Sequence, residues 1–128
     1  MLTSEIFCFD NLVEAEKELT KINANPVGVK IMALKAVFKS VKITDVDSKT
    51  ANMLKQEMLS RGGDIAVSKD AGSFDAERTD IIIMGSFAQH IRLIRKLQHQ
   101  KFGECRKIAQ ILQETLFADQ DITNLSVW

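Results

Sequence analysis

In the stretch 12–22, glutamate and lysine alternate with apolar residues that recur three or four positions apart, namely Leu12, Ala15, Leu19 and Ile22. This spacing predicts an amphipathic helix on the surface of the protein. Asp10 or Asn11 can cap its start. Its end is predicted near Pro26, because the residue before a proline avoids the α conformation.

Two stretches have the apolar pattern of buried strands. Residues 5–9 are apolar on both alternating faces, and residues 80–84 contain three consecutive isoleucines. Strands with two apolar faces lie in sheets that helices cover on both sides. Both stretches are therefore predicted as strands of such a sheet, with 80–84 at its centre and Cys8 as a small buried residue of the other strand. A shorter strand is predicted at 64–68.

The stretch 27–46 permits two interpretations. Val29, Met32 and Ala33 fit a helix, whereas the alternation after them favours an extended segment over 36–43. We favour the extended segment.

Three further helices are predicted. One begins at a cap on Asp45 or Asp47, runs through Ser60 and ends at Gly62-Gly63, since glycine accepts the conformation of a helix C-cap.

The next begins at Gly85-Ser86. Its core stripe and its solvent-facing basic residues are, respectively, Phe87, Ile91, Ile94 and Leu97, and Arg92, Arg95 and Lys96. The last follows Gly103 and repeats apolar residues at Ile108, Ile111 and Leu112.

The predicted order of elements is β, α, β, α, β, β, α, α. Alternating elements of this kind indicate an α/β fold. We expect a single domain over residues 1–118, with a mixed or mostly parallel sheet of about four strands and helices on both faces. Residues 119–128 show no period and are expected to form an irregular tail.

The amino-acid composition excludes several classes of function but does not indicate a particular one. The chain has 128 residues, and its 17 basic and 17 acidic side chains give a net charge of zero, which is not the charge of a nucleic-acid-binding domain. Its apolar runs are too short to span a membrane. Cys8 and Cys105 form no CxxC pair, as expected of reduced thiols in the cytoplasm. We therefore expect a cytoplasmic protein with no nucleic-acid or membrane partner.

Candidate ligand-binding residues lie at predicted strand ends and beside one apolar stretch. If the strands are parallel, Ser68 and Lys69 would lie near Gly85 and Ser86, where ligands commonly bind such sheets. The simpler alternative makes Ser86 a helix N-cap. Lys30 and Lys35 could also face a ligand, although lysines at this spacing are equally typical of an exposed edge strand.

No complete catalytic set or cofactor motif is present. The sequence contains neither the Rossmann glycine fingerprint nor a P-loop. His90 and His99 lie nine positions apart, which does not suit two metal ligands on one helix face. We predict no catalytic residue, no metal site and no cofactor.

Four blocks carry a resemblance to a known family: residues 26–33 (PVGVKIMA), 51–59 (ANMLKQEML), 62–68 (GGDIAVS) and 79–85 (TDIIIMG). Together they resemble the N-terminal extension that precedes the barrel in long bacterial dihydropteroate synthases, and the block at 51–59 is the most specific. The resemblance implies a link to folate and pterin metabolism. It also implies a dihydropteroate synthase barrel domain as a partner, in the same chain or a separate one.

The resemblance carries over no catalytic residue. A (β/α)8 barrel needs roughly 250 residues, so it does not fit in this chain. The leading hypothesis is a non-catalytic accessory domain that binds a partner domain or a small ligand. The alternatives are a small stand-alone enzyme or ligand-binding protein with a site near Ser68 and Gly85, and a homo-oligomerisation module, suggested by Phe102, Phe117, Leu125, Val127 and Trp128.

Overall fold

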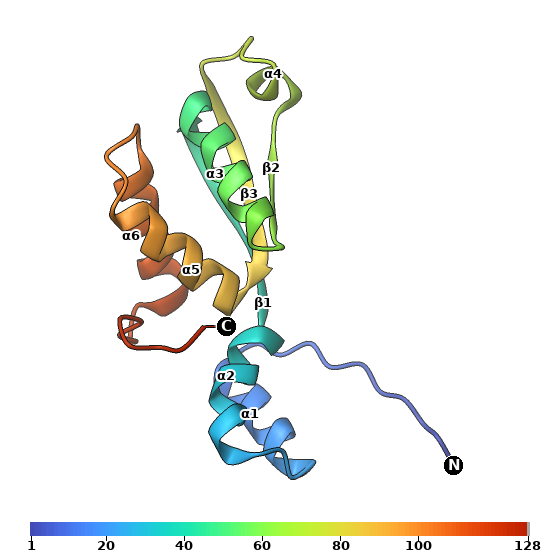
Figure 1. Cartoon of the computed structure of the whole chain (residues 1–128). Helices are drawn as coiled ribbons and strands as arrows, with labels where there is room; N and C mark the ends of the chain where they lie inside the picture. Colours follow the sequence, from blue (N-terminus) through green and yellow to red (C-terminus); the bar gives the residue numbers. More distant parts are fainter. Residues whose placement is uncertain (128) are drawn as a thin grey trace.

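The computed structural model describes residues 1–127. In chain order its elements are α1 (Leu12–Lys21), α2 (Pro26–Ala36), β1 (Phe38–Asp47), α3 (Ser48–Ser60), β2 (Asp64–Val67), α4 (Lys69–Gly72), β3 (Arg78–Ser86), α5 (Phe87–Gln98) and α6 (Cys105–Phe117), as Figure 1 shows. The predicted mixture of helices and strands is confirmed.

The sheet has three strands in the order β1-β3-β2, and both outer strands run antiparallel to β3. The prediction of about four strands in a mixed or mostly parallel sheet is corrected in both respects, since the sheet has three strands and its neighbouring strands are all antiparallel. Residues 5–9 join no sheet, and the short connection from β2 to β3 permits only an antiparallel neighbour, because parallel neighbours need a longer crossover. Helix α3 provides the crossover between β1 and β2, which lie parallel on either side of β3.

Helices cover one face of the sheet. Helices α3 and α5 pack on that covered face, where Ile81 is 1% exposed and Ile83 is 0% exposed, whereas Ile82 on the other side is 38% exposed. Figure 1 shows α1 and α2 packed together beyond the end of the sheet rather than on its second face. The prediction that helices lie on both faces is therefore wrong.

The predicted helix boundaries agree closely with the structure. The Asn11 side chain accepts a hydrogen bond from Glu14 N at 2.9 Å and caps α1, and the Asp47 side chain accepts from Thr50 N at 3.0 Å and caps α3. Gly62 follows α3 with a φ of 87°, a conformation that glycine adopts at little cost.

Both interpretations of the stretch 27–46 are partly correct. Its first half forms α2, and its second half forms β1, which begins two residues later and ends four residues later than the predicted 36–43. The strand continues past Ile43 because a bulge at Asp45, with a φ of 59°, absorbs the irregularity before Val46 pairs again.

Residues 1–9, which we call the arm, form no strand although the apolar pattern predicts one. Ile6 is 90% exposed, and only Phe9 packs against the core. Cys8 is exposed, so the prediction of a buried thiol is wrong. In Figure 1 the arm runs away from the sheet, which leaves its apolar side chains without a covering layer.

The irregular C-terminal segment lies against the helices. Phe117 is buried, and Leu125 and Val127 pack against the core, while Trp128 lies outside the described residues. Arg95 Nη2 donates to Leu125 O at 2.7 Å, and Arg92 Nη2 donates to Val127 O at 3.0 Å. The helical period alone predicted that the two arginines face solvent. They instead hold this segment.

Candidate functional site

The residues predicted at strand ends do not lie together. Because β2 and β3 are antiparallel, Val67 at the end of β2 pairs with Ile81, whereas Gly85 lies at the opposite end of β3 and pairs with Lys39. Ser68 and Lys69 are exposed, and the Ser68 hydroxyl accepts a hydrogen bond from Ala71 N at 3.1 Å as the cap of α4.

The start of α5 is closed by its own capping contacts. Ser86 Oγ accepts from Gln89 N at 3.2 Å, and Ser86 N donates to Gln89 Oε1 at 2.9 Å. Phe87 N donates to Val37 O at 2.9 Å, and a Cβ added at Gly85 would lie 2.6 Å from Met58 Cε. These N–H groups are already paired, and the glycine at position 85 serves close packing rather than ligand binding.

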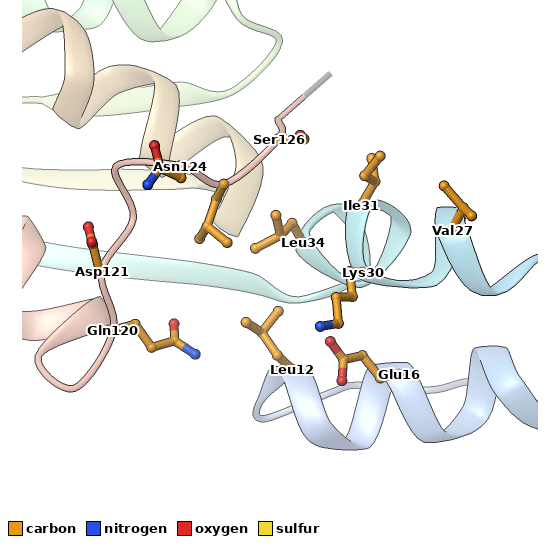
Figure 2. Close-up of a pocket in the computed structure, with 11 residues that line it drawn as sticks. Leu12, Glu16, Val27, Lys30, Ile31, Leu34, Gln120, Asp121, Asn124 and Ser126 are labelled. Atoms are coloured by element: carbon orange, nitrogen blue, oxygen red, sulfur yellow. The ribbon is translucent and has the colours of Figure 1, made fainter.

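Lys30 lines a cleft with a volume of about 610 Å³. The cleft lies between the α1–α2 pair and the C-terminal segment, and Figure 2 shows the Lys30 side chain of α2 and the Glu16 side chain of α1 pointing toward one another on the same wall. Leu34 and Leu125 form part of its apolar lining. Lys35 is exposed and does not line this cleft.

The cleft combines an apolar lining with a few charges, as small-molecule sites commonly do. Lys30 contributes an ammonium group, and Glu16 and Asp121 contribute carboxylates. Arg95 fixes one wall, because it donates hydrogen bonds to backbone carbonyls of the C-terminal segment. The geometry suits a small molecule with an apolar body and polar groups at its edge.

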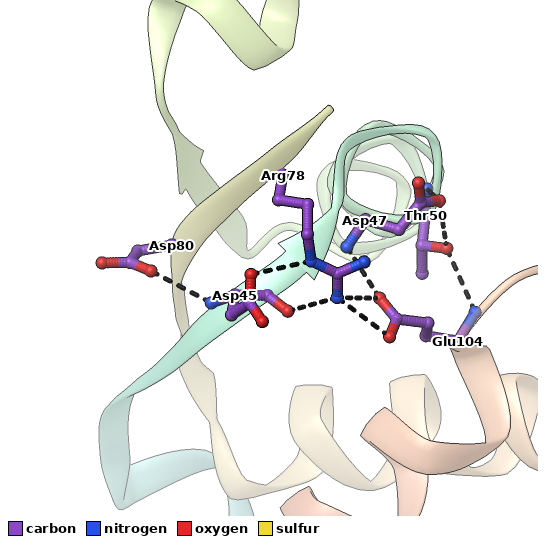
Figure 3. Close-up of polar contacts among 6 residues, drawn as sticks. All are labelled: Asp45, Asp47, Thr50, Arg78, Asp80 and Glu104. Atoms are coloured by element: carbon purple, nitrogen blue, oxygen red, sulfur yellow. Dashed lines mark hydrogen bonds and ion pairs between the residues drawn. The ribbon is translucent and has the colours of Figure 1, made fainter. Parts of the chain in front are cut away.

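A cluster of polar side chains around Arg78 joins β1, β3 and the start of α6 (Figure 3). Arg78 Nε donates to Asp45 Oδ1 at 2.7 Å, and Arg78 Nη2 donates to both Glu104 carboxylate oxygens at 3.1 Å. Glu104 Oε1 also accepts from Asp47 N at 2.7 Å. This backbone hydrogen bond, helped by Arg78, lowers the pKa of Glu104.

This cluster has the geometry of a stabilising network of ion pairs and hydrogen bonds rather than that of a reactive centre. The Asp45 and Glu104 carboxylates raise the pKa of the Arg78 guanidinium, so the three side chains stabilise one another as charged groups. The cluster could not be predicted directly from the sequence because its members are far apart along the chain. Asp45 and Asp47, predicted as alternative caps of the helix that runs through Ser60, were the sequence feature that pointed to this region.

His90 is a core residue. Its Nε2 lies 2.9 Å from Lys39 O, and burial lowers the pKa of the imidazole, which favours the neutral form. His99 is exposed. Within residues 1–127 no group of three or more histidine, cysteine, aspartate or glutamate side chains could hold a metal ion. In the same range no helix is both long and apolar enough to cross a membrane.

The second side of the sheet, which we call the open face, carries uncovered apolar side chains. Phe38 is 60% exposed and Ile82 is 38% exposed. Met84, which follows Ile82 on the same side of β3, is half-buried. Lys42 pairs with Ile82 and Asp64 pairs with Met84, so charged residues lie beside the apolar ones. The polar residues Ser40, Lys42 and Thr44 at alternating positions were the sequence signal for this exposure.

Comparisons with known proteins give one informative similarity. No family model and no solved structure matches the chain. Over 107 residues the chain is 35% identical to a probable bifunctional folylpolyglutamate synthase/dihydropteroate synthase from Halobacterium salinarum. The chain resembles a segment of a folate-pathway enzyme. The matched segment is 84% of this chain but 13% of the length of that relative.

Proposed function

We propose that this chain is a non-catalytic accessory domain of folate and pterin metabolism that binds a catalytic partner domain through the open face of its sheet. The observation that carries the proposal is the exposed apolar centre of that face. Ile82 and Met84 lie on the central strand, on the side of the sheet away from α3 and α5, and Ile82 is 38% exposed.

The composition of the open face supports a protein partner. Its apolar centre is bordered by the exposed charged residues Lys42, Asp64 and Asp80. An apolar core within a polar rim is typical of protein–protein interfaces. The rim carries both signs of charge, so it favours a specific orientation of a partner rather than a generally acidic or basic one.

The similarity to the relative from Halobacterium salinarum supports the identity of the partner. That relative is named for two synthase activities, and the matched segment is a small share of its length. A segment of this size within a long chain has other domains available to contact. We propose that the corresponding partner of this chain is a dihydropteroate synthase catalytic domain, in the same chain or a separate one.

The state of the titratable side chains supports a non-catalytic role. His90 is buried and favours the neutral form, Glu104 is engaged by Arg78 and a backbone N–H group, and burial raises the pKa of the Cys105 thiol. A general acid or base needs access to a substrate, and a nucleophilic cysteine needs a lowered pKa. These groups instead have the environments of structural residues.

A calorimetric titration of this chain with a separately expressed dihydropteroate synthase catalytic domain tests the proposal. We expect binding, and we expect Ile82→Asp to abolish it because the substitution places a charge at the centre of the open face. Ile111→Asp is the matched control, since Ile111 is 41% exposed on α6 and lies outside that face. Absence of heat with the wild-type chain, or equal loss in both variants, would contradict the proposal.

The cleft around Lys30 supports a second candidate function, the binding of a small ligand. A carboxylate on an aromatic ligand could pair with Lys30 while the ring contacts Leu34 and Leu125. Thermal shift measurements with p-aminobenzoate and with a pterin carboxylate test this function. Lys30→Ala should remove any stabilisation, and Lys35→Ala should retain it because Lys35 lies outside the cleft. Equal responses of the two variants would exclude this site.

A further inference from the structure

We propose that two copies of this chain pair by exchanging their arms, each arm adding a fourth strand to the free β1 edge of the other copy. The inference concerns the edge of the sheet and goes beyond the proposed function, which concerns its open face. It rests on three observations: an unpaired edge, an unpaired strand-like segment, and opposite charges on the two.

The outer edge of β1 has backbone groups without partners. Phe87 N donates to Val37 O, one residue before β1, and Lys39 of β1 pairs with Gly85. Val37 and Lys39 therefore turn their backbone groups toward β3. Inward and outward groups alternate along an edge strand. Phe38, Ser40 and Lys42 therefore direct their N–H and C=O groups away from β3, and within residues 1–127 these groups form no hydrogen bond.

The opposite edge of the sheet is blocked by side chains. Lys55 Nζ donates to Ile65 O at 2.8 Å, and the Asp64 carboxylate accepts from Ile65 N at 2.7 Å. Charged side chains on an edge strand are a common protection against pairing with another chain. Because side chains already occupy the outward N–H and C=O groups of Ile65 on β2, whereas those of Ser40 and Lys42 on β1 are free among the described residues, an added strand is directed to β1.

The arm has the properties of the missing strand. Its residues 5–9 have the apolar pattern of a strand, yet they are extended without a sheet partner, and Phe7 and Phe9 stack with ring centroids 5.4 Å apart. Isolated exposed apolar residues are common on protein surfaces, but a continuous apolar strand is a site for pairing. Figure 1 shows the arm directed away from its own sheet, which favours the edge of another copy.

The charges of the two segments are complementary. The arm carries Glu5 and no lysine or arginine, whereas β1 carries Lys39 and Lys42 and no acidic residue before Asp45. Opposite charges on neighbouring strands stabilise pairing. Exchange of arms about a two-fold axis satisfies both edges at once and gives a closed dimer.

Light scattering in reducing buffer over a range of concentrations tests the exchange. The wild-type mass should rise from 14.4 kDa to twice that value, and deletion of residues 1–9 should hold it at 14.4 kDa. Ser40→Pro should also give a monomer, because it removes an outward N–H group and leaves the β1–β3 ladder intact, whereas Ser40→Ala should dimerise like wild type. A wild-type chain that stays monomeric at every concentration would overturn the proposal.

Two further experiments keep the test independent of folding defects. A mixture of the arm-deleted chain and the Ser40→Pro chain should form a heterodimer, since one supplies the edge and the other the arm.

Glu5→Lys and Lys42→Glu should each weaken dimerisation several-fold, and the two substitutions together should restore it. Dimers that persist without the arm would overturn the exchange, as would hydrogen-exchange protection of the Ser40 and Lys42 amides in a monomeric sample, which would indicate pairing within one chain. Neither result depends on the catalytic-domain titration.

Discussion

The two faces of the sheet place the same residue type in two different environments. Ile81 and Ile83 contact the helices of the covered face, while Ile82 between them lies on the open face beside Lys42. Three consecutive isoleucines therefore serve two purposes. Ile81 and Ile83 belong to the buried core, whereas Ile82 between them is 38% exposed. An apolar run shows that a strand is central, but it does not show what covers each side.

The largest expected difference between the faces is in stability. Ile83→Ala should lower the free energy of unfolding by about 2–5 kcal/mol, because it leaves a cavity among side chains that cannot close completely. Ile82→Ala should cost below about 1 kcal/mol, because its side chain already contacts solvent. Urea unfolding measures both values. Equal losses would show that the open face is covered in the isolated chain.

Glycine-to-alanine substitutions test how closely the covered side of the sheet is packed. Gly85→Ala on the covered side should destabilise the domain by about 1–3 kcal/mol, because the new Cβ would lie 2.6 Å from Met58 Cε and 2.9 Å from Gln89 Oε1. Gly72→Ala should be neutral or stabilising, since no atom lies within 4 Å of its added Cβ. Thermal unfolding of the two variants would test this difference, and a Gly85→Ala protein as stable as the wild type would show that the Met58 and Gln89 side chains can turn away from position 85.

The cap of α5 provides a smaller effect on the covered side. Ser86→Ala should cost about 1 kcal/mol, because it removes the hydroxyl that accepts a hydrogen bond from Gln89 N. Ser40→Ala on the open side should be close to neutral in monomeric samples, since its side chain is exposed. Denaturant midpoints at low protein concentration provide the measurement. A larger cost at Ser40 would reverse the assignment of the two faces.

The smallest effect is a dependence on pH where α6 meets β1. The folded state lowers the pKa of Glu104 below its ordinary value of 4.5, chiefly through the Asp47 N–H group. Its stabilising contribution is therefore present above pH 4.5 and is lost as the pH falls through the lowered pKa. Glu104→Gln should flatten this part of the acid unfolding curve. An unchanged curve would show that Glu104 does not contribute to acid sensitivity.

Local features of the fold could be predicted from the sequence because neighbouring residues determine them. Asn11 and Asp47, each one of two predicted caps, and the predicted cap Ser86 all cap their helices. The central position of the isoleucine strand is also confirmed. Both interpretations of the stretch 27–46 were needed, because the helix passes directly into the strand.

Features that depend on long-range packing could not be predicted in the same way. The apolar pattern of residues 5–9 shows a tendency to form a strand but does not name its partner. The period of α5 placed Arg92 and Arg95 on a polar face, yet it could not reveal that the C-terminal segment lies there. The candidate residues Ser68 and Gly85 depended on parallel strands, so the antiparallel pairing separated them.

The central claim is that the open face of the sheet is a docking surface. A methyl NMR titration with the dihydropteroate synthase catalytic domain tests it most directly, with Ile82 and Met84 as reporters on that face and Ile111 as a reporter outside it. We predict that the Ile82 and Met84 signals shift or broaden on addition of the catalytic domain while Ile111 remains unchanged. Unchanged Ile82 and Met84 signals, or a response confined to Ile111, would contradict the account.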